Sequence, residues 1–355
     1  MATRSFAKED RTKSWLYTVS TLVLLTLMFM GTYWNLNWGL RIVCSLCTAF
    51  VFTRMFVIYH DYLHHTILRN STLAKVIFYI FGLFTLAPNS IWKRSHDYHH
   101  NHNSKLYSAS IGSFPVATKN QFLNASRREQ FLYLCARHPI TIIFGYCTVF
   151  LYGMCVKPLM SKPKQHIDAL LALVLHVILG SCLVWHGGIA SLFLSLILPC
   201  FLTFGFGAYL FYAQHNFPNV TFESKEHWAY EHAALESSSY MVMGRFMRWV
   251  TGNIGFHHIH HINSRIPFYC LPAVMAKFPE FQQAKTTSLY WKDIRACLRL
   301  KIWDTEQGKM LSLSELKQCQ LHNIPKIDGN KIHEKVSVKI DVSGTTNFPI
   351  TIIKN

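Results

Sequence analysis

The sequence of 355 residues carries little charge. Asp, Glu, Lys and Arg make up 15% of the chain, hydrophobic residues make up 50%, and the mean hydropathy is +0.17. An average soluble domain has about 25% charged residues. Two runs, residues 16–40 and 169–222, contain no charged residue at all, and each is long enough to cross a bilayer. This shortage of charge excludes an ordinary soluble domain and predicts an integral membrane protein.

Acidic residues are scarcer still, with 18 Asp and Glu against 35 Lys and Arg and a formal net charge of +17. Lys and Arg collect in the cytosolic loops of membrane proteins, so we expect no nucleic-acid partner. The ten cysteines predict no disulfide framework, because six of them lie in apolar segments where a thiol acts as a small hydrophobic group. These six are Cys44, Cys47, Cys147, Cys155, Cys182 and Cys200.

Two further absences narrow the function. The sequence contains no Glu-x-x-His, the pair from which ferritin-like di-iron proteins build their sites, and that class is excluded. The apolar runs are almost free of the polar or acidic residues that a metal transporter needs for a pathway through the membrane. A non-enzymatic metal transporter or sensor is therefore disfavoured.

The apolar runs predict an all-α integral membrane protein with four transmembrane helices, at about residues 16–34, 42–59, 169–185 and 189–212. The last two spans turn near Trp185–Gly188. The basic N-terminus places both termini in the cytosol, and Arg54 is expected to reach the membrane surface by snorkelling.

Two weaker apolar segments, residues 76–92 and 139–156, are predicted to be interfacial or re-entrant. Pro88 and Asn89 interrupt the first, and basic residues flank the second on both sides. From about residue 223 we expect a cytosolic helical cap. Residues 1–310 are predicted to form one domain, followed by a variable tail at 311–355 in which residues 336–342 alternate like a strand.

The histidines are concentrated: eleven of the 20 lie in three short segments, residues 60–65, 96–102 and 257–261. Within each segment the spacing is i, i+4 or i, i+3, i+4, which places the side chains on one face of a helix. This pattern selects eight candidate metal ligands: His60, His64, His96, His99, His100, His257, His260 and His261.

A ninth candidate, His215, closes the last predicted span. All nine would then meet at the cytosolic surface, and nine imidazoles are too many for one metal ion, so two ions are implied. Imidazole suits iron, zinc, copper and nickel, and the ligand type alone does not choose among them.

Neighbouring residues receive other interpretations. His65, His102 and His258 fall off the predicted helix faces and are expected to be surface or supporting groups, and His176 is expected to be a hydrogen-bonded core residue. Asp61 and Asp97 each follow the first histidine of a cluster. Either carboxylate could fix the orientation of a liganding imidazole, or could be a surface or capping residue.

The three histidine clusters resemble those of the membrane fatty acid desaturases in order and spacing. Residues 210–217 (LFYAQHNF), 249–269 (WVTGNIGFHHIHHINSRIPFY) and 299–304 (RLKIWD) are similar to bacterial acyl desaturases of the omega-6, or delta-12, type. The resemblance covers roughly residues 15–310. The chain differs from front-end desaturases, which commonly have Gln at the position of His257. No His-Pro-Gly-Gly is present, so no cytochrome b5 domain is expected within the chain.

This resemblance implies two iron ions on the cytosolic side, held by the nine candidate histidines, with O2 as co-substrate and no catalytic side chain beyond the ligands. Removing hydrogen from an unactivated methylene group requires O2 that is activated on a metal, and this requirement favours iron. The substrate would be an acyl lipid, acyl-CoA or acyl carrier protein, and the electron donor ferredoxin or cytochrome b5. The resemblance favours a bacterial inner membrane over the endoplasmic reticulum. A membrane hydroxylase or ketolase acting on a sterol or carotenoid stays open as the alternative.

Overall fold

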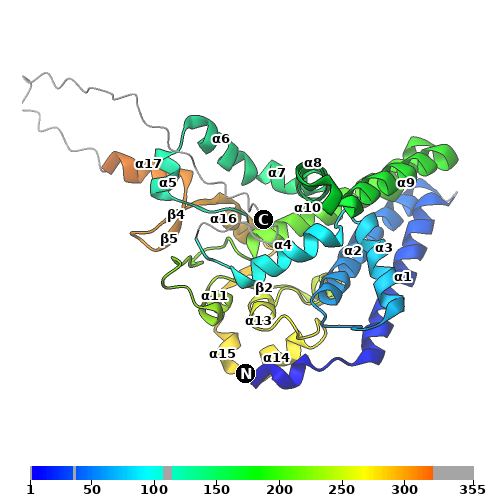
Figure 1. Ribbon diagram of the computed structural model, residues 1–355, viewed down its shortest axis with the longest axis horizontal. Coiled ribbons are helices and arrows are strands. Elements are labelled where there is room, and N and C mark those ends of the chain that lie inside the picture. Colours follow the sequence, from blue (N-terminus) through cyan, green and yellow to red (C-terminus); the bar gives the residue numbers. More distant parts are fainter. Residues whose placement is uncertain (1, 35–36, 107–113, 323–355) are drawn as a thin grey trace, which may run out of the picture.

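The computed structural model describes residues 2–34, 37–106 and 114–322. Helices form most of this part of the chain. Long helices gather at one end of the molecule, and short helices with two small sheets form a cap at the other (Figure 1). The site described below lies where the long helices enter the cap.

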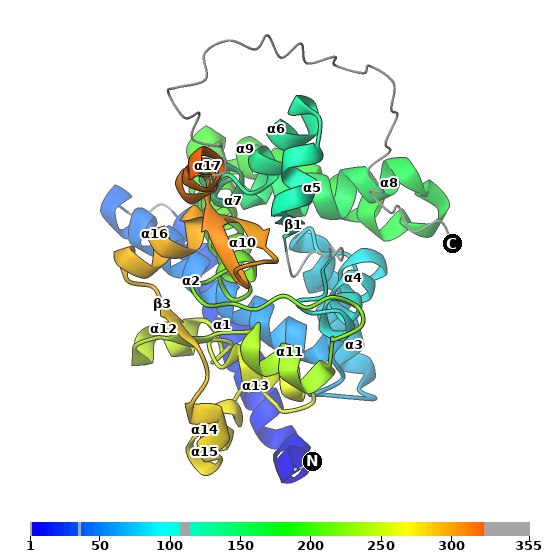
Figure 2. The same cartoon turned by 90° about the vertical axis from the view of Figure 1, so that its left-hand side faces the viewer.

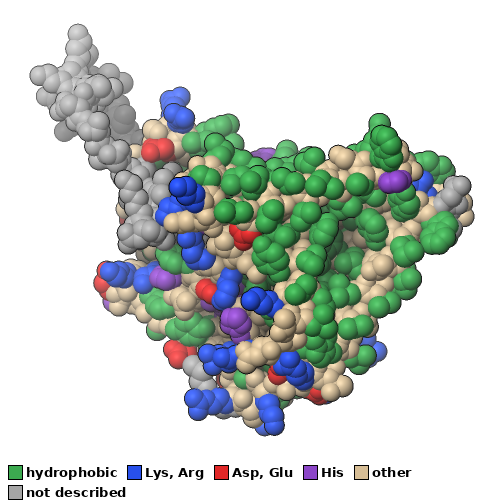
Figure 3. All heavy atoms as spheres, turned by 45° about the vertical axis from the view of Figure 1, so that its right-hand side comes forward, with side chains coloured by type: hydrophobic (Ala, Val, Ile, Leu, Met, Phe, Trp, Pro, Cys, Tyr) green, Lys and Arg blue, Asp and Glu red, His purple; other side chains and the backbone are tan. Residues whose placement is uncertain are grey.

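The long helices are α1 (Arg11–Tyr33), α2 (Trp38–Leu63) and a nearly continuous run of α9 (Ile167–Leu192), η4 (Phe193–Ile197) and α10 (Leu198–Ala213). Three segments, 11–33, 38–63 and 167–213, are long and apolar enough to span a membrane. A fourth is the bent pair α3 (Thr72–Phe84) and α4 (Asn89–Asn101), which meet at 93° and form either a broken span or a re-entrant loop. Apolar side chains cover the surface of the long helices, and charged ones gather on the cap (Figure 3). The chain is therefore a mostly helical membrane protein, as predicted.

The run from α9 to α10 reverses direction at Gly188, where a turn was expected. Gly188 has φ 67° and ψ −174°, a backbone conformation that residues other than glycine rarely adopt. A Cβ atom on Gly180 would lie 3.4 Å from Leu192 and 3.8 Å from Leu196, so the segments before and after Gly188 pack side by side.

Polar contacts join this turn to the connection between α1 and α2. Arg41 donates hydrogen bonds from Nε to Thr32 O at 2.9 Å and from Nη2 to Ser191 Oγ at 3.1 Å. The hydroxyl of Thr32 donates to Ser195 Oγ at 2.7 Å. These bonds tie the helix ends together at the opposite end of α2 from His60.

Arg54 corrects one prediction, because it does not snorkel to the surface. Only 5% of the residue is exposed. Its Nε donates to Thr21 Oγ1 at 3.2 Å and its Nη1 donates to the carbonyl oxygen of Trp249. The guanidinium also lies over the rings of Tyr17, Trp249 and Phe268, at 5.5, 4.8 and 5.7 Å from their centroids. Aromatic faces, the Thr21 hydroxyl and the Trp249 carbonyl thus satisfy this charge inside the protein.

The segment between α4 and α9 forms short elements. They are α5 (Lys119–Asn124), α6 (Arg127–Ala136), α7 (Pro139–Ile143), η2 (Tyr146–Val156), α8 (Lys157–Ser161) and η3 (Pro163–Gln165). Two glycines let α7 and η2 lie directly against α10. A Cβ atom on Gly145 would come within 2.6 Å of Phe204 O, and one on Gly205 within 2.5 Å of Ile143 O. Small residues allow this close approach of backbones, as is common between membrane helices.

The cap follows α10 and contains the rest of the helices: α11 (Tyr230–Glu236), α12 (Arg245–Val250), α13 (His257–Ile262), α14 (Leu271–Lys277), α15 (Pro279–Gln282), α16 (Trp291–Arg299) and α17 (Leu313–His322). A 3-10 turn, η1 (Ala2–Ala7), precedes α1. Figure 2 shows the cap from the front, with the long helices behind it.

The cap also contains short strands, in addition to the helices that the sequence predicted. One sheet has the order β1 (Ala117–Thr118), β4 (Leu300–Asp304), β5 (Lys309–Ser312), with β4 and β5 antiparallel. The other pairs β2 (Tyr240–Val242) with β3 (Thr286–Ser288) in parallel. Short strands with irregular register give a weak periodic signal, so the sequence reading missed them.

The boundary between domain and tail stays a prediction, although the structure bears on its position. Leu311 and Leu316 are buried against Ile302 and Phe122. Gly308 adopts φ 59° in the turn before β5. The folded part of the chain thus continues past residue 310, and the strand expected at residues 336–342 lies outside the described residues.

Candidate metal centre

The first histidine cluster lies at the cap end of α2. His60 is in the last helical turn, and His64 caps the helix through its backbone N–H, which donates to His60 O at 3.1 Å. The i, i+4 spacing places both imidazoles on one face, as expected. The exposed His65 follows with φ 56° and turns the chain away from the cluster.

The second cluster lies on α4, whose start is fixed to α9. The backbone N–H and the hydroxyl of Ser90 donate to the two oxygens of Asp168, at 2.9 and 2.6 Å. A carboxylate at a helix N-terminus is also favoured by the helix dipole. From this anchor α4 carries His96, His99 and His100 as buried residues on one face, with the Trp92 ring packed 4.3 Å from that of His96.

The third cluster forms the short helix α13. His257, His260 and His261 are buried and share one face, and the hydroxyl of Tyr230 donates to His261 O at 2.6 Å. His258 is also buried but points the other way, with Nε2 3.2 Å from Phe281 O. As expected from the spacing, His258 therefore does not lie on the face of α13 that the other three histidines share.

His215 joins these clusters from the end of α10. Its Nδ1 lies 3.0 Å from Ser237 O, a pure acceptor, so Nδ1 carries the proton and Nε2 keeps its lone pair. His215 Nε2 lies 3.0 Å from His99 Nε2 and 2.9 Å from His257 Nε2. One carbonyl group of the cap thus sets the tautomer of this imidazole.

All nine histidines selected from the sequence come together, and they divide into two groups. Within each group the candidate ligand nitrogens lie within 4.8 Å of one another. The five-histidine group consists of His60, His64, His96, His100 and His260. The four-histidine group consists of His99, His215, His257 and His261.

Eight of these imidazoles are held in the neutral form that a metal requires. Burial is the largest cause and lowers the pKa of His215 to about 4. Burial, together with neighbouring imidazoles, lowers the pKa of a further seven histidines well below their usual range. These seven are His64, His96, His99, His100, His257, His260 and His261.

The arrangement fits metal ions. In the four-histidine group neighbouring Nε2 atoms lie 2.9 to 3.2 Å apart, and all four ligand nitrogens are close enough together to bind one ion. In the five-histidine group four Nε2 atoms do the same at 2.8 to 3.1 Å. Each group can therefore hold one metal ion, of a kind that accepts several nitrogen ligands.

The two aspartates differ in their surroundings. Asp61 is fully buried, with one oxygen 3.2 Å from His60 Nδ1 and the other accepting the Phe268 backbone N–H at 2.7 Å. Asp97 instead pairs with Lys93 at 2.6 Å on the surface. Of the two interpretations left open for these residues, Asp61 fits the orientation of a candidate ligand, His60, whereas Asp97 forms an ion pair at the surface.

Two other histidines, His102 and His176, lie away from the two groups. His102 stacks on the Tyr98 ring at 4.0 Å, and its Nδ1 lies 2.9 Å from Tyr98 O. His176 is hydrogen-bonded to the hydroxyl of Tyr146, in agreement with a core role. Neither belongs to the five-histidine group or the four-histidine group.

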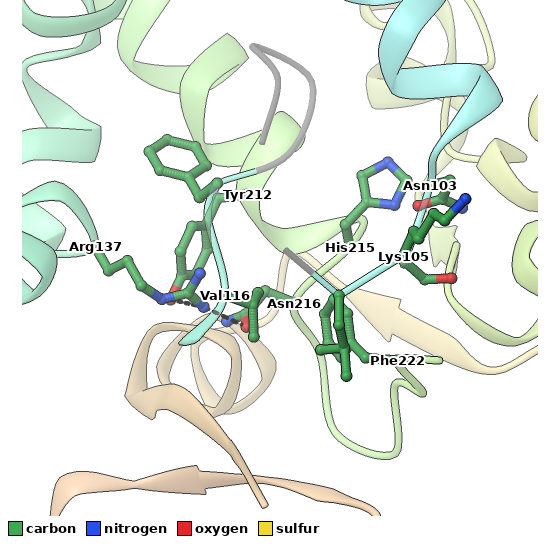
Figure 4. Close-up of a pocket in the computed structure, with 11 residues that line it drawn as sticks. Asn103, Lys105, Val116, Arg137, Tyr212, His215, Asn216 and Phe222 are labelled. Atoms are coloured by element: carbon green, nitrogen blue, oxygen red, sulfur yellow. Dashed lines mark hydrogen bonds between the residues drawn. The ribbon is translucent and has the colours of Figure 1, made fainter. Parts of the chain in front are cut away.

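A pocket lined by both polar and apolar side chains adjoins His215 (Figure 4). At one end the buried Arg137 donates from Nη2 to Asn216 Oδ1 at 2.6 Å, and from Nη1 to Pro115 O at 2.7 Å. Asn216 in turn donates to Cys297 O at 2.7 Å. This network fixes the residue next to His215 to the cap. The sequence reading missed it, because nothing local to Arg137 indicates a partner so far along the chain.

An apolar cavity lies on another side of the centre. It is bounded by α2, η2, α10 and the segment before α13, and His60, His96 and His257 form part of its wall. Its other lining residues include Phe56, Phe150, Phe204, Gly207, Leu210 and Ile254. A nonpolar molecule in this cavity would touch histidines of both groups.

Comparisons with known proteins agree with this geometry. The sequence model of the family described as fatty acid desaturase matches residues 36–292. A fatty acid desaturase from Bacillus subtilis is 30% identical over 321 residues, which cover 88% of this chain and 89% of the relative. An sn-1 oleoyl-lipid 12-desaturase from Anabaena variabilis is 22% identical, covering 77% of this chain and 78% of the relative. A chloroplastic omega-6 fatty acid desaturase from Spinacia oleracea is also 22% identical, covering 74% and 58%. The chain therefore belongs to the fatty acid desaturase family.

Proposed function

We propose that the chain is an O2-dependent acyl desaturase that holds two iron ions and introduces a cis double bond. The observation that carries this proposal is the gathering of nine histidines into two groups beside an apolar cavity. The five-histidine group would hold one iron and the four-histidine group the other.

The reaction takes an acyl chain, O2, two electrons and two protons to a cis-alkene and two waters. Iron at the two groups would supply the oxidising chemistry that breaks unactivated C–H bonds, which side chains alone cannot do. The protein positions the ligands: Asp61 orients His60, and Ser237 O orients His215. No side chain needs to act as a nucleophile or to form a covalent intermediate.

The apolar cavity is the place for the acyl chain. Its wall offers aromatic and aliphatic groups along α2 and α10, and it ends on His60, His96 and His257. Such a wall binds methylene groups by burial and excludes water from the reacting carbons. The carbons beside these histidines would be the ones that lose hydrogen.

The proposed topology has four spans: α1, α2, the part of α9 before Gly188, and η4 with α10. Both termini and the histidines would face the cytosol, because Lys and Arg gather on the cap. The same basic face would attract an acidic electron donor, such as ferredoxin or cytochrome b5. The membrane would be a bacterial inner membrane.

The regiochemistry is proposed as delta-12, or omega-6. Two relatives named for 12-desaturation or omega-6 desaturation support this choice at 22% identity. The acyl carrier would be a glycerolipid, acyl-CoA or acyl carrier protein. A hydroxylase or ketolase acting on a sterol or carotenoid would share the histidine site and differ in its product.

Expression in a bacterium that makes monounsaturated but no polyunsaturated fatty acids tests the proposal. Gas chromatography–mass spectrometry of the lipids is expected to show a new diene, with the second double bond at the delta-12 position. A parallel culture with His261→Ala is expected to lack it. Another double-bond position would correct the regiochemistry, and a hydroxylated product in place of the diene would overturn desaturation.

A further inference from the structure

The cap helix α12 lies beside the membrane-spanning helix α2. The Phe246 ring meets the Phe50 ring edge-on at 5.3 Å, and the Trp249 carbonyl accepts a hydrogen bond from Arg54. Phe50 precedes His60 by ten residues, which is about 15 Å along a helix. In the proposed topology α12 therefore reaches below the level of the metal centre, into the cytosolic leaflet.

Large apolar side chains are exposed on this part of the cap. Phe246 is 58% exposed, Trp249 40%, Tyr290 79% and Trp291 69%. Phe246 and Trp249 lie on α12, and Tyr290 and Trp291 lie at the start of α16. Strands β2 and β3 pair with Val242 opposite Ser288, and this pairing brings the two helices to one edge of the cap (Figure 2). We call these four residues the aromatic surface. Trp and Tyr in such a position are typical of a membrane–water interface.

Basic side chains lie on the same two helices as the aromatic surface. Arg245 lies at the start of α12, and Lys292 and Arg295 lie on α16; all three are exposed. Residues 240–250 contain no acidic residue, and residues 286–300 contain only Asp293, which accepts a hydrogen bond from Ser288. The exposed charge here is therefore positive, which attracts anionic lipid headgroups.

We propose that the aromatic surface, with Arg245, Lys292 and Arg295, is a binding site for anionic phospholipid of the cytosolic leaflet. The aromatic rings would lie among the upper parts of the acyl chains, and the three basic side chains would contact the phosphate groups. The inference rests on the proposed topology and does not depend on the reaction chemistry.

The site would also hold lipid close to the apolar cavity. The stretch of α2 that meets α12 overlaps the cavity wall, which includes Thr53, Phe56 and Val57. Ile254, four residues after α12, lines the same cavity. An acyl chain that extends from a headgroup bound at the aromatic surface would lie at the depth of this cavity.

Quenching of tryptophan fluorescence tests the proposal on the purified full-length chain in detergent. Phosphatidylglycerol with brominated acyl chains is expected to quench at lower concentrations than brominated phosphatidylcholine. The triple variant Arg245→Gln, Lys292→Gln, Arg295→Gln should raise the concentration for half-quenching, by roughly fivefold per charge and about a hundredfold in all. The double variant Trp249→Phe, Trp291→Phe should remove most of the quenched signal.

A matched control changes the same number of charges elsewhere. Arg127→Gln, Arg128→Gln, Lys317→Gln removes three exposed basic side chains from α6 and α17 and should leave the quenching curve unchanged. Thermal melting verifies that every variant is folded. Equal quenching of the wild type and the Arg245 triple variant would overturn the proposal. So would displacement of the lipid by millimolar inorganic phosphate, or light scattering that shows a second copy of the chain on this surface. Because no turnover is measured, an inactive protein that binds lipid would count only against the proposed function.

Discussion

The carboxylate of Asp61 accepts a hydrogen bond from the backbone N–H of Phe268 at 2.7 Å, across 207 residues of sequence. Its other oxygen lies 3.2 Å from His60 Nδ1. One buried side chain thus joins the end of α2 to the segment after α13, and the first histidine cluster to the third. A metal site assembled from distant segments depends on such supporting contacts.

Replacing Asp61 by Asn should therefore weaken metal binding. The amide keeps the size of the carboxylate but loses its charge and one acceptor oxygen, and a loss of about 10- to 100-fold in metal affinity is expected. Competition with a chelator, followed by metal analysis, measures the change. Asp97→Asn is the control, since Asp97 occupies the same place after the first histidine of its cluster but pairs with Lys93 at the surface. Equal losses in the two variants would contradict the role given to Asp61.

The two histidine groups should respond differently to the loss of one ligand. His64→Ala leaves four histidines in its group, whereas His261→Ala leaves three. We expect purified His64→Ala protein to retain close to two irons per chain, and His261→Ala protein to retain about one. Elemental analysis measures the ratio, with the exposed His65→Ala as control. Complete loss of both irons in each variant would show that the groups are not separate sites.

Gly207 offers a way to fill the apolar cavity. A Cβ atom on Gly207 would meet nothing within 4 Å, and the residue lines the cavity. Gly207→Leu should lower turnover of long acyl chains at least tenfold, because its side chain occupies their space, while iron content and melting temperature stay unchanged. Gly244→Leu is the control: its Cβ is equally free of contacts but lies outside the cavity lining. Full activity of Gly207→Leu protein would place the acyl chain elsewhere.

Lys301 should make stability depend on pH. Burial and the nearby Arg137 lower the pKa of Lys301 from 10.5 to about 8. Between pH 8 and pH 10.5 the unfolded chain therefore binds more protons at this side chain than the folded protein, so this group makes the free energy of unfolding rise with pH.

Comparison with the Lys301→Met variant isolates the contribution of Lys301 to the pH dependence of the free energy of unfolding. Between pH 7.5 and pH 9.5 the wild type should gain about 2 kcal/mol relative to this variant, and melting curves at the two pH values measure the difference. Lys317→Met, at an exposed position on α17, should follow the wild type. Parallel pH dependence of wild type and Lys301→Met would contradict the inference.

The sequence predicted those parts of the site that follow from local spacing. The i, i+3, i+4 pattern identified His96, His99 and His100 as one face of a helix, and the structure places them on the buried face of α4. His215 was found from its place at the end of an apolar run. Gly188 marks the turn that the two glycines after His186 predicted.

Contacts between distant segments could not be predicted in this way. Ser237 supports His215 through a backbone carbonyl, which every residue type possesses. Arg54 was expected at the surface because its local sequence does not reveal that Trp249 and Phe268 cover it. The pairing of strand β4 could not be predicted from its own sequence, because its partner β1 lies far earlier in the chain.

The mass of the product formed by purified, iron-loaded protein with a working electron donor distinguishes desaturation from hydroxylation. With an acyl lipid substrate and 18O-labelled O2, we expect an unlabelled product two mass units lighter than the substrate, in which two methylene hydrogens have been lost and a cis double bond has formed. The label should appear in water. A product that carries the 18O atom as a hydroxyl group would contradict the account and identify a hydroxylase, and unchanged acyl chains in protein with two bound irons would exclude the acyl substrate.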